Sequence, residues 1–249
     1  MNKIIVSNNK ISSDSFDINI KNNEVVFNNS GEYILEYTQD GSYNITFIIK
    51  NDVKLIESSY DLELDINNKY IIDNGSLKVV KFYNNKKVIE NIDIDLCTSR
   101  SKIDYYFSNI CRMEERYNIN VNHKCKETIS NIQNKSIALK NSILKFVINS
   151  NVGKDSVESV LEQNTRIVTM GECDAAISPN MYIDLDDVSA KHGSVIGSFK
   201  DDVIFYLMSK GINYNDTLKL LIKGYIMSNM DVDVDNRMKI MEIIDLYWR

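Results

Sequence analysis

Two residues of this sequence, a histidine and a cysteine, are the first candidates for binding iron or carrying sulfur. His192 lies in AKHGSVIG, beside small residues, and Cys173 lies in MGECDAAISP. Imidazole nitrogens and thiolates both bind transition metals, so these side chains could act together if the fold places them at the same end of a sheet. A structural role stays open for both. A lone histidine in a strand often only makes hydrogen bonds, and a buried cysteine packs as a small apolar side chain.

The remaining polar residues give little support for other chemistry. His123 is the only other histidine, which leaves little room for a nucleophile–histidine pair. No CxxC pair joins the cysteines, so we expect free thiols rather than disulfides or a structural zinc site; they are Cys97, Cys111, Cys125 and Cys173. The acidic string 231–235 lacks the glycine and final glutamate of a calcium loop. We interpret it and the string 184–187 as solvated strand edges or helix starts.

Composition narrows the class of protein. The 249 residues include 29 Lys+Arg and 35 Asp+Glu, a formal net charge of −6, and no basic stripe suited to nucleic acid. No apolar run approaches the roughly 18 residues of a membrane span, and the first residues do not form a signal peptide. We therefore expect a cytoplasmic protein that binds neither membrane nor nucleic acid. Its 43% hydrophobic content is enough for a real core.

Many short strands are predicted up to about residue 197. They alternate apolar and polar residues and are separated by Asn- and Gly-containing bends, with one ambiguous segment at 101–118. A sandwich, an antiparallel barrel and a β-helix all fit this pattern. Two-residue hairpin turns are nearly absent, which favours a solenoid, although no exact repeat length emerges.

From residue 198 the apolar period changes to that of helices. Asp201 and Asp202 suit a first helical turn, and Gly211 suits a helix end. Asn213 or Asn215 could cap a second helix whose apolar face contains Leu218, Leu221, Ile222, Tyr225 and Ile226. The sequence therefore predicts a mainly β core over 1–197 and a small C-terminal α-helical domain over 198–249.

The segment 179–230 resembles the signature region of the SufB/SufD family, scaffold subunits of the Suf iron–sulfur cluster assembly machinery. The matching elements are Pro179, Ile183, Asp187-Val188, His192-Gly193, Gly197, Asp201-Asp202, Phe205-Tyr206-Leu207, Lys210-Gly211 and Gly224-Tyr225. The resemblance extends upstream to about residue 120. It implies a right-handed parallel β-helix followed by a helical C-terminal domain.

The resemblance also implies a function. Members pair through the terminal rungs of the β-helix, here with a SufB-like subunit or a second copy. They dock a SufC-like ABC ATPase through the C-terminal helices, and the complex receives sulfur from a donor and builds a transient iron–sulfur cluster. We therefore expect a scaffold, not an independent enzyme, with no stably bound cofactor. The implied ATPase-docking residues are Asp201, Asp202, Phe205, Tyr206, Leu207, Lys210, Gly211, Gly224 and Tyr225.

Position by position, the chain is nearer to SufD than to SufB. His192 matches the histidine that both subunits place near the interface, and Gly193 follows it where SufB-like subunits have a glutamate. The cysteine implicated in cluster assembly in SufB-like subunits falls at Asn164, and a cysteine of some SufD-like chains falls at Ala190. Cys173 matches a second cysteine of some SufB-like chains. We expect this chain to be a short form that lacks the N-terminal helical domain of longer members.

His192 and Cys173 are therefore the candidate cluster or metal ligands. Two alternatives remain. One is a family member whose role is only structural. The other is a β-helix enzyme acting on polysaccharide, which would need paired carboxylates or a calcium-bound aspartate set on one face.

Overall fold

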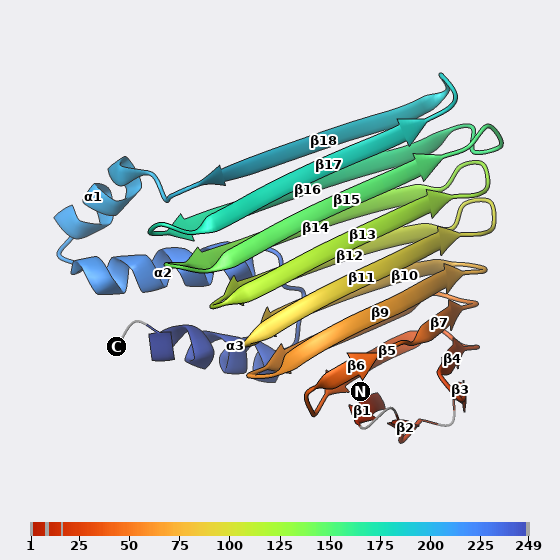
Figure 1. Ribbon diagram of the computed structural model, residues 1–249, viewed down its shortest axis with the longest axis horizontal. Coiled ribbons are helices and arrows are strands. Elements are labelled where there is room, and N and C mark those ends of the chain that lie inside the picture. Colours follow the sequence, from red (N-terminus) through yellow and green to blue (C-terminus); the bar gives the residue numbers. More distant parts are fainter. Residues whose placement is uncertain (1, 8–9, 16, 248–249) are drawn as a thin grey trace.

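The computed structural model describes residues 2–7, 10–15 and 17–247, and its strands form two long sheets that face each other (Figure 1). Sheet A has the strand order β18-β16-β14-β12-β10-β8-β5-β1-β2, and sheet B has the order β17-β15-β13-β11-β9-β7-β4-β3, with β6 also paired to β9. The strands of sheet A are β1 (Asn2–Ser7), β2 (Lys10–Ser13), β5 (Gly31–Tyr37), β8 (Val53–Tyr60), β10 (Ser76–Asn84), β12 (Lys102–Cys111), β14 (Ile129–Leu139), β16 (Ser159–Met170) and β18 (Val188–Gly197). Those of sheet B are β3 (Ile18–Lys21), β4 (Glu24–Phe27), β6 (Gly41–Tyr43), β7 (Thr46–Ile49), β9 (Glu63–Ile72), β11 (Lys87–Leu96), β13 (Glu114–His123), β15 (Ile143–Val152) and β17 (Asp174–Ile183).

From β7 on, consecutive strands alternate between the two sheets, and from β5 on each strand pairs in parallel with the strand one coil away. The result is a β-solenoid of about seven turns, which confirms the predicted parallel β-helix. The coil length is not constant. Leu77 pairs with Ile103, Ile103 with Ser130 and Ser130 with Leu161, so successive coils hold 26, 27 and 31 residues. Because the extra residues enter at the corners, the sequence shows no fixed repeat.

Alternation places one side of each strand in a closed core between the sheets. Aromatic rings pack there: Tyr117 stacks on Phe146 of the next coil, with ring centroids 4.9 Å apart, and meets Phe107 of the facing sheet edge-on, with centroids 4.7 Å apart. The ambiguous segment 101–118 consists of β12, a corner and the start of β13. Its inward residues, Ile103, Tyr105 and Phe107, follow the strand period and are buried.

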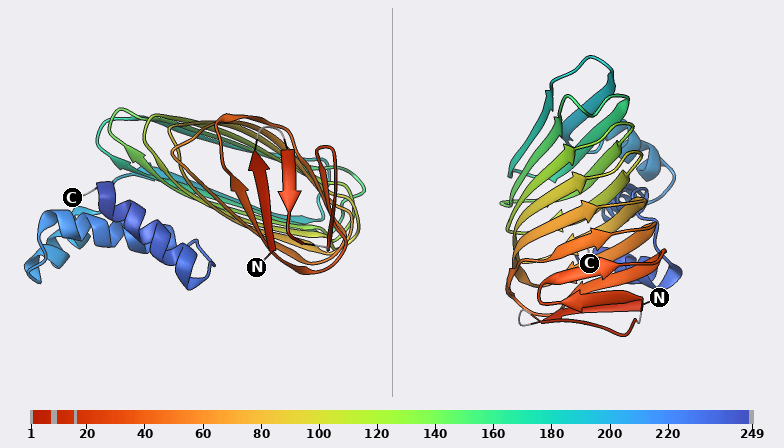
Figure 2. Two further views of the ribbon diagram at one scale, coloured as in Figure 1. Left: turned by 90° about the horizontal axis from the view of Figure 1, so that it is seen from below. Right: turned by 90° about the vertical axis from the view of Figure 1, so that its right-hand side faces the viewer.

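Three helices follow the solenoid and lie beside sheet A (Figure 2): α1 (Asp201–Ser209), α2 (Tyr214–Met227) and α3 (Val234–Tyr247). Helices α2 and α3 and the segment between them cover the outward apolar residues of sheet A and form a second core. It contains Ile56, Val80, Phe82, Ile110, Ile137 and Val168 from the sheet and Ile222, Ile226, Met230, Val232, Ile240 and Ile244 from the helical segment. Burial on both faces explains why β10 contains the run VVKFY rather than a simple alternation.

The helix ends follow the sequence signals. Asn213 is the cap of α2, since its side chain accepts a hydrogen bond from the backbone N–H of Asp216 at 2.9 Å. Gly211 follows α1 with φ +87°, a conformation that glycine adopts without strain.

Candidate functional site

The C-terminal end of the solenoid is uncovered. β17 and β18 are the last strands of their sheets, and within the described part of the chain no strand pairs with their outer edges. None of their described residues is buried, whereas β15 and β16 bury every second residue. Residues at inward positions of β17 and β18 are therefore exposed, although the residues at the same positions one coil earlier belong to the core. Ile196, for example, pairs with the buried Ile167 but is 45% exposed.

His192 lies in the middle of this open end. It pairs in register with Gln163 of β16, and in-register neighbours of parallel strands share a face, so His192 lies on the inward face of the last coil. Gln163 is buried and donates from Nε2 to Ser150 Oγ at 2.7 Å and to the carbonyl oxygen of Asn180 at 3.3 Å. His192 itself is exposed. Asn164 and Gly193, the two positions that differ from SufB-like subunits, pair with each other.

Cys173 lies at a corner of the solenoid, far from His192. It is half-buried, it packs against the core, and it comes directly before β17. Its thiol has a raised pKa because of burial and the neighbouring Asp174 carboxylate. Gln163, the in-register neighbour of His192, donates to the Asn180 carbonyl oxygen, so Asn180 lies level with His192. Asn180 is seven residues after Cys173. At about 3.3 Å per residue of strand, Cys173 therefore lies about 20 Å from His192. One chain therefore does not bring them to one metal ion.

Helix α1 presents a second exposed surface, which combines aromatic and charged side chains. None of its described residues is buried, and Phe205 is 67% and Tyr206 60% exposed. Asp201 and Asp202 are exposed in the first turn, Leu207 is half-buried, and Lys210 and Gly211 are exposed just after the helix. We call the surface formed by Asp201, Asp202, Phe205, Tyr206 and Lys210 the α1 surface.

Gly224 and Tyr225 do not belong to the α1 surface. Gly224 is exposed on α2, but Tyr225 is half-buried against the solenoid. The Tyr225 hydroxyl donates to the carbonyl oxygen of Arg166 at 2.6 Å. The Tyr225 ring packs edge-on against the Phe199 ring, with the ring centroids 6.1 Å apart. Tyr225 thus fixes α2 to sheet A.

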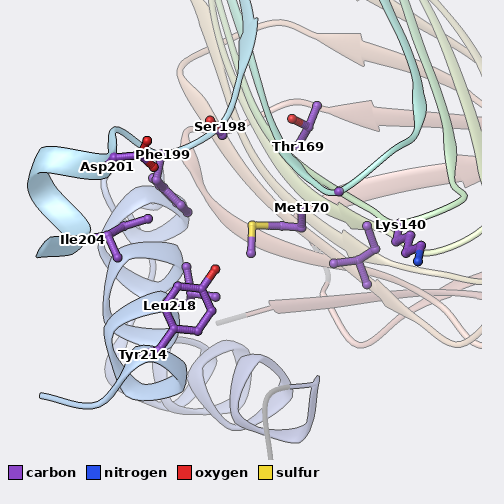
Figure 3. Close-up of a pocket in the computed structure, with 11 residues that line it drawn as sticks. Lys140, Thr169, Met170, Ser198, Phe199, Asp201, Ile204, Tyr214 and Leu218 are labelled. Carbon is purple, nitrogen blue, oxygen red and sulfur yellow. The ribbon is translucent and has the colours of Figure 1, made fainter. Parts of the chain in front are cut away.

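A groove of about 620 Å³ separates α1 and α2 from the end of sheet A (Figure 3). Met170 points into it from β16, and Ile204 and Leu218 line it from the helices. Polar side chains also line it, among them Lys140, Thr169, Ser198 and Asp201. This arrangement leaves α1 attached mainly through α2.

The acidic string 231–235 makes structural contacts, and the string 184–187 forms the corner between β17 and β18. Asp231 forms ion pairs with Lys78 at 2.6 Å and Lys54 at 3.2 Å, and these contacts lower its pKa. Asp233 accepts a hydrogen bond from the backbone N–H of Asn236 at the start of α3. Among the described residues, no group of three or more metal-binding side chains lies together. No helix in the described part of the chain is long and apolar enough to cross a membrane.

Sequence reasoning missed a charged cluster inside the solenoid. Lys81 is fully buried between the carboxylates of Glu57, at 3.1 Å, and Glu90. Burial raises the pKa of Glu90 to about 7, against the attraction of Lys81. The available signal was Lys81 itself, which occupies an inward position of a strand after Leu77 and Val79. Glu57 comes from the preceding coil and Glu90 from the facing strand β11, so these partners could not be paired from sequence.

Comparison with known proteins gives the family of this fold. The family model described as "SUF system FeS cluster assembly, SufBD core domain" matches residues 57–225. Over 76 residues (30% of this chain and 18% of the relative), the chain is 30% identical to the iron–sulfur cluster assembly protein SufD of Escherichia coli (strain K12). Over 97 residues (32% and 22%), it is 28% identical to the SufD of Bacillus subtilis (strain 168). A SufBD family protein of Mycobacterium leprae (strain TN) is 37% identical over 65 residues (26% and 17%). The matches thus span less than a quarter of the length of these relatives.

Proposed function

Because the chain belongs to the SufBD family of iron–sulfur cluster assembly proteins, we propose that it acts as a SufD-like scaffold subunit of a Suf complex. In this proposal it pairs through β17 and β18 with a SufB-like subunit or a second copy, and it docks a SufC-like ABC ATPase through its C-terminal helices. It has no catalytic residues of its own. The nascent iron–sulfur cluster is its cargo and not a resident cofactor.

The open end of the solenoid carries this proposal. A parallel sheet normally has covered edges, since unpaired N–H and C=O groups invite another strand. Here the inward Ile196 is 45% exposed, and Ile177, which pairs with the buried Phe146, is only half-buried on β17. Pairing with another chain would cover these apolar side chains and continue both sheets. A partner would also bring its own side chains to His192.

In the proposed complex His192 is an interface ligand of the cluster. Its imidazole is exposed on the uncovered end of the core, where a partner's ligands would face it. Cys173 is a second proposed ligand. Because about 20 Å separates it from His192, it would have to act with a different set of partner side chains.

The α1 surface is the proposed docking site of the ATPase. Exposed aromatic residues are frequent anchors of protein interfaces, and Phe205 and Tyr206 project from a helix that makes few contacts with its own chain. Sulfur would enter through the assembled complex. This protein is proposed to act in the cytoplasm.

The experiment is co-expression of the tagged chain with a SufB-like subunit and a SufC-like ATPase, followed by mass measurement of the purified complex. We expect one copy of this chain with a second SufBD-type subunit, and ATPase subunits attached. A chain that elutes as a monomer, with neither partner bound, would contradict the proposal. Retained assembly without any effect of His192 on cluster formation would favour a purely structural family member.

A further inference from the structure

The corner of the solenoid farthest from the helices contains two cysteines on neighbouring coils. Cys97 follows β11 and Cys125 follows β13, at the ends of strands that point away from the helical domain (Figure 1). The proposed function uses neither of them. Both are half-buried, so reagents from solvent can reach them.

The backbone register places these cysteines diagonally across from each other on two neighbouring coils. Leu96 pairs with His123, and the N–H of Lys124 donates to the carbonyl oxygen of Leu96 at 3.0 Å. Cys97 therefore lies opposite Lys124, and Cys125 is one residue further along. With coils about 4.8 Å apart and about 3.3 Å per residue, the two Cα atoms lie about 6 Å apart, within the roughly 4.4–6.8 Å that a disulfide bridges. The Cys125 thiol already points to the other coil, because its Sγ donates to the Cys97 carbonyl oxygen at 3.0 Å.

Ion pairs hold the two corner segments together. The nearly buried Asp95 carboxylate, two residues before Cys97, binds Lys124 at 2.9 Å and also Lys69 of the preceding coil at 3.0 Å. On the other side of the cysteines, Arg100 binds Glu127 at 2.5 Å. The segments that carry the two thiols are thus fixed to each other on both sides.

We propose that Cys97 and Cys125 form a reversible disulfide that joins two successive coils of the solenoid. The thiolate of one cysteine attacks a sulfur of a small-molecule disulfide such as oxidised glutathione, and one glutathione thiolate leaves. The second cysteine then attacks the protein sulfur of the mixed disulfide, and the second glutathione leaves. The protein loses two protons and two electrons, and the oxidant is reduced to two thiols.

The other two cysteines supply a matched control. The Cys111 thiol donates to the carbonyl oxygen of Ile143 at 3.4 Å, and Ile143 pairs with Asp174, the residue after Cys173. One coil therefore lies between Cys111 and Cys173. Two coil spacings amount to about 10 Å, which is too far for a disulfide without backbone movement.

In the resting state the pair is expected to be reduced. Burial and the Asp95 carboxylate raise the pKa of Cys97, so its thiol stays protonated near neutral pH. Reaction therefore requires an added oxidant and time, and a strong reductant reverses it.

The test is disulfide mapping of the folded full chain after incubation with oxidised glutathione. Free thiols are then blocked with N-ethylmaleimide in urea, which exposes the buried Cys111, before digestion and mass spectrometry. We expect a linked peptide pair containing Cys97 and Cys125, with Cys111 and Cys173 alkylated. The Cys173→Ser variant should give the same linked pair. The Cys125→Ser variant should give none, and its Cys97 should be alkylated or carry one glutathione.

Thermal unfolding provides a second measurement on the same samples. Oxidation should raise the Tm of the wild type by a few degrees, dithiothreitol should reverse the rise, and Cys125→Ser should show none. Four alkylated cysteines after oxidation, glutathione on Cys97 and Cys125 without a link between them, or a link to a different cysteine would overturn the proposal.

Discussion

His192 and Gln163 are neighbours in register on β18 and β16, yet their side chains meet opposite surroundings. Gln163 is 2% exposed and donates to the Ser150 hydroxyl and the Asn180 carbonyl oxygen. His192 lies on the same inward face as Gln163, but on the last coil, where no part of the described chain covers it. The inward face of the solenoid therefore ends in an exposed imidazole, and the proposed role of this residue rests on that position.

Replacing His192 by alanine should impair cluster assembly without affecting the fold. Because the side chain is exposed, the free energy of unfolding should change by less than about 0.5 kcal/mol. Cluster yield in an anaerobic reconstitution with the complete complex should fall several-fold. The control is Lys191→Ala, which removes the adjacent exposed side chain of the outward face. Equal cluster yield from both variants would remove His192 from the ligand set.

A charge placed on the α1 surface should release the ATPase. Phe205→Asp changes a side chain that is 67% exposed, so the fold should tolerate it. Loss of an aromatic anchor should weaken binding at least about tenfold, or about 1.4 kcal/mol, measured by titration calorimetry with the purified ATPase. Leu246→Asp on α3, where the side chain is 60% exposed, serves as control. If both variants bind as tightly as the wild type, the ATPase does not dock on α1.

Removal of the buried lysine should destabilise the solenoid. Lys81→Met leaves Glu57 and Glu90 buried without their cation, which should cost about 3–5 kcal/mol in urea unfolding. Lys87→Met is the comparison, since Lys87 is 46% exposed and its ion pair with Glu114 spans 3.5 Å. That change should cost less than about 1 kcal/mol. Similar losses for both variants would mean that the inner cluster contributes no more than a surface pair.

The buried His123 should make the protein less stable in acid. Burial lowers its pKa to about 4, and its ring nitrogens lie 2.7 Å from the Thr128 hydroxyl and 2.9 Å from that of Ser130. Below the ordinary histidine pKa of about 6.5, the unfolded state binds a proton that the folded state does not. Stability is therefore lost as the pH falls from about 6.5 towards 4.

When the pH falls from 7.5 to 5, uptake of this proton by the unfolded state should lower the free energy of unfolding by about 2 kcal/mol. The measurement is urea unfolding at both pH values for the wild type and for His123→Gln, which removes the titrating ring. The wild type should lose about 2 kcal/mol more than the variant. His192→Ala, which keeps His123, should behave as the wild type. An equal pH dependence in all three proteins would refute this role of His123.

The local elements could be predicted from sequence because they depend on neighbouring residues. Strand alternation, the helical period after residue 198, and the cap at Asn213 are all visible in short windows. The way in which the strands stack into coils could not be predicted from short windows of sequence. Successive coils differ in length, and the contacts between them join residues that are 26 to 31 positions apart. The resemblance to a family, rather than periodicity, gave the parallel topology.

The site was predicted in part. His192 and the α1 residues were named from the signature, and the structure places them on exposed surfaces. Sequence gave no means of seeing that Cys173 lies about 20 Å from His192, because that distance follows from register along β17. The inner cluster was hidden for the same reason, since Lys81 meets Glu57 and Glu90 only when three strands are assembled.

The central claim is that the open end of the solenoid binds a second SufBD-type subunit, and Ile196→Glu tests it most directly. This change places a carboxylate on the uncovered inward face, whereas Ile89→Glu places one on the outward face of sheet B, where Ile89 is 37% exposed. The measurement is the solution mass of the chain, alone and after co-expression with a SufB-like subunit. The account predicts a paired species for the wild type and Ile89→Glu, and a folded monomer for Ile196→Glu. A wild-type chain that remains monomeric in both cases, or an Ile196→Glu variant that pairs as well as the wild type, would contradict it.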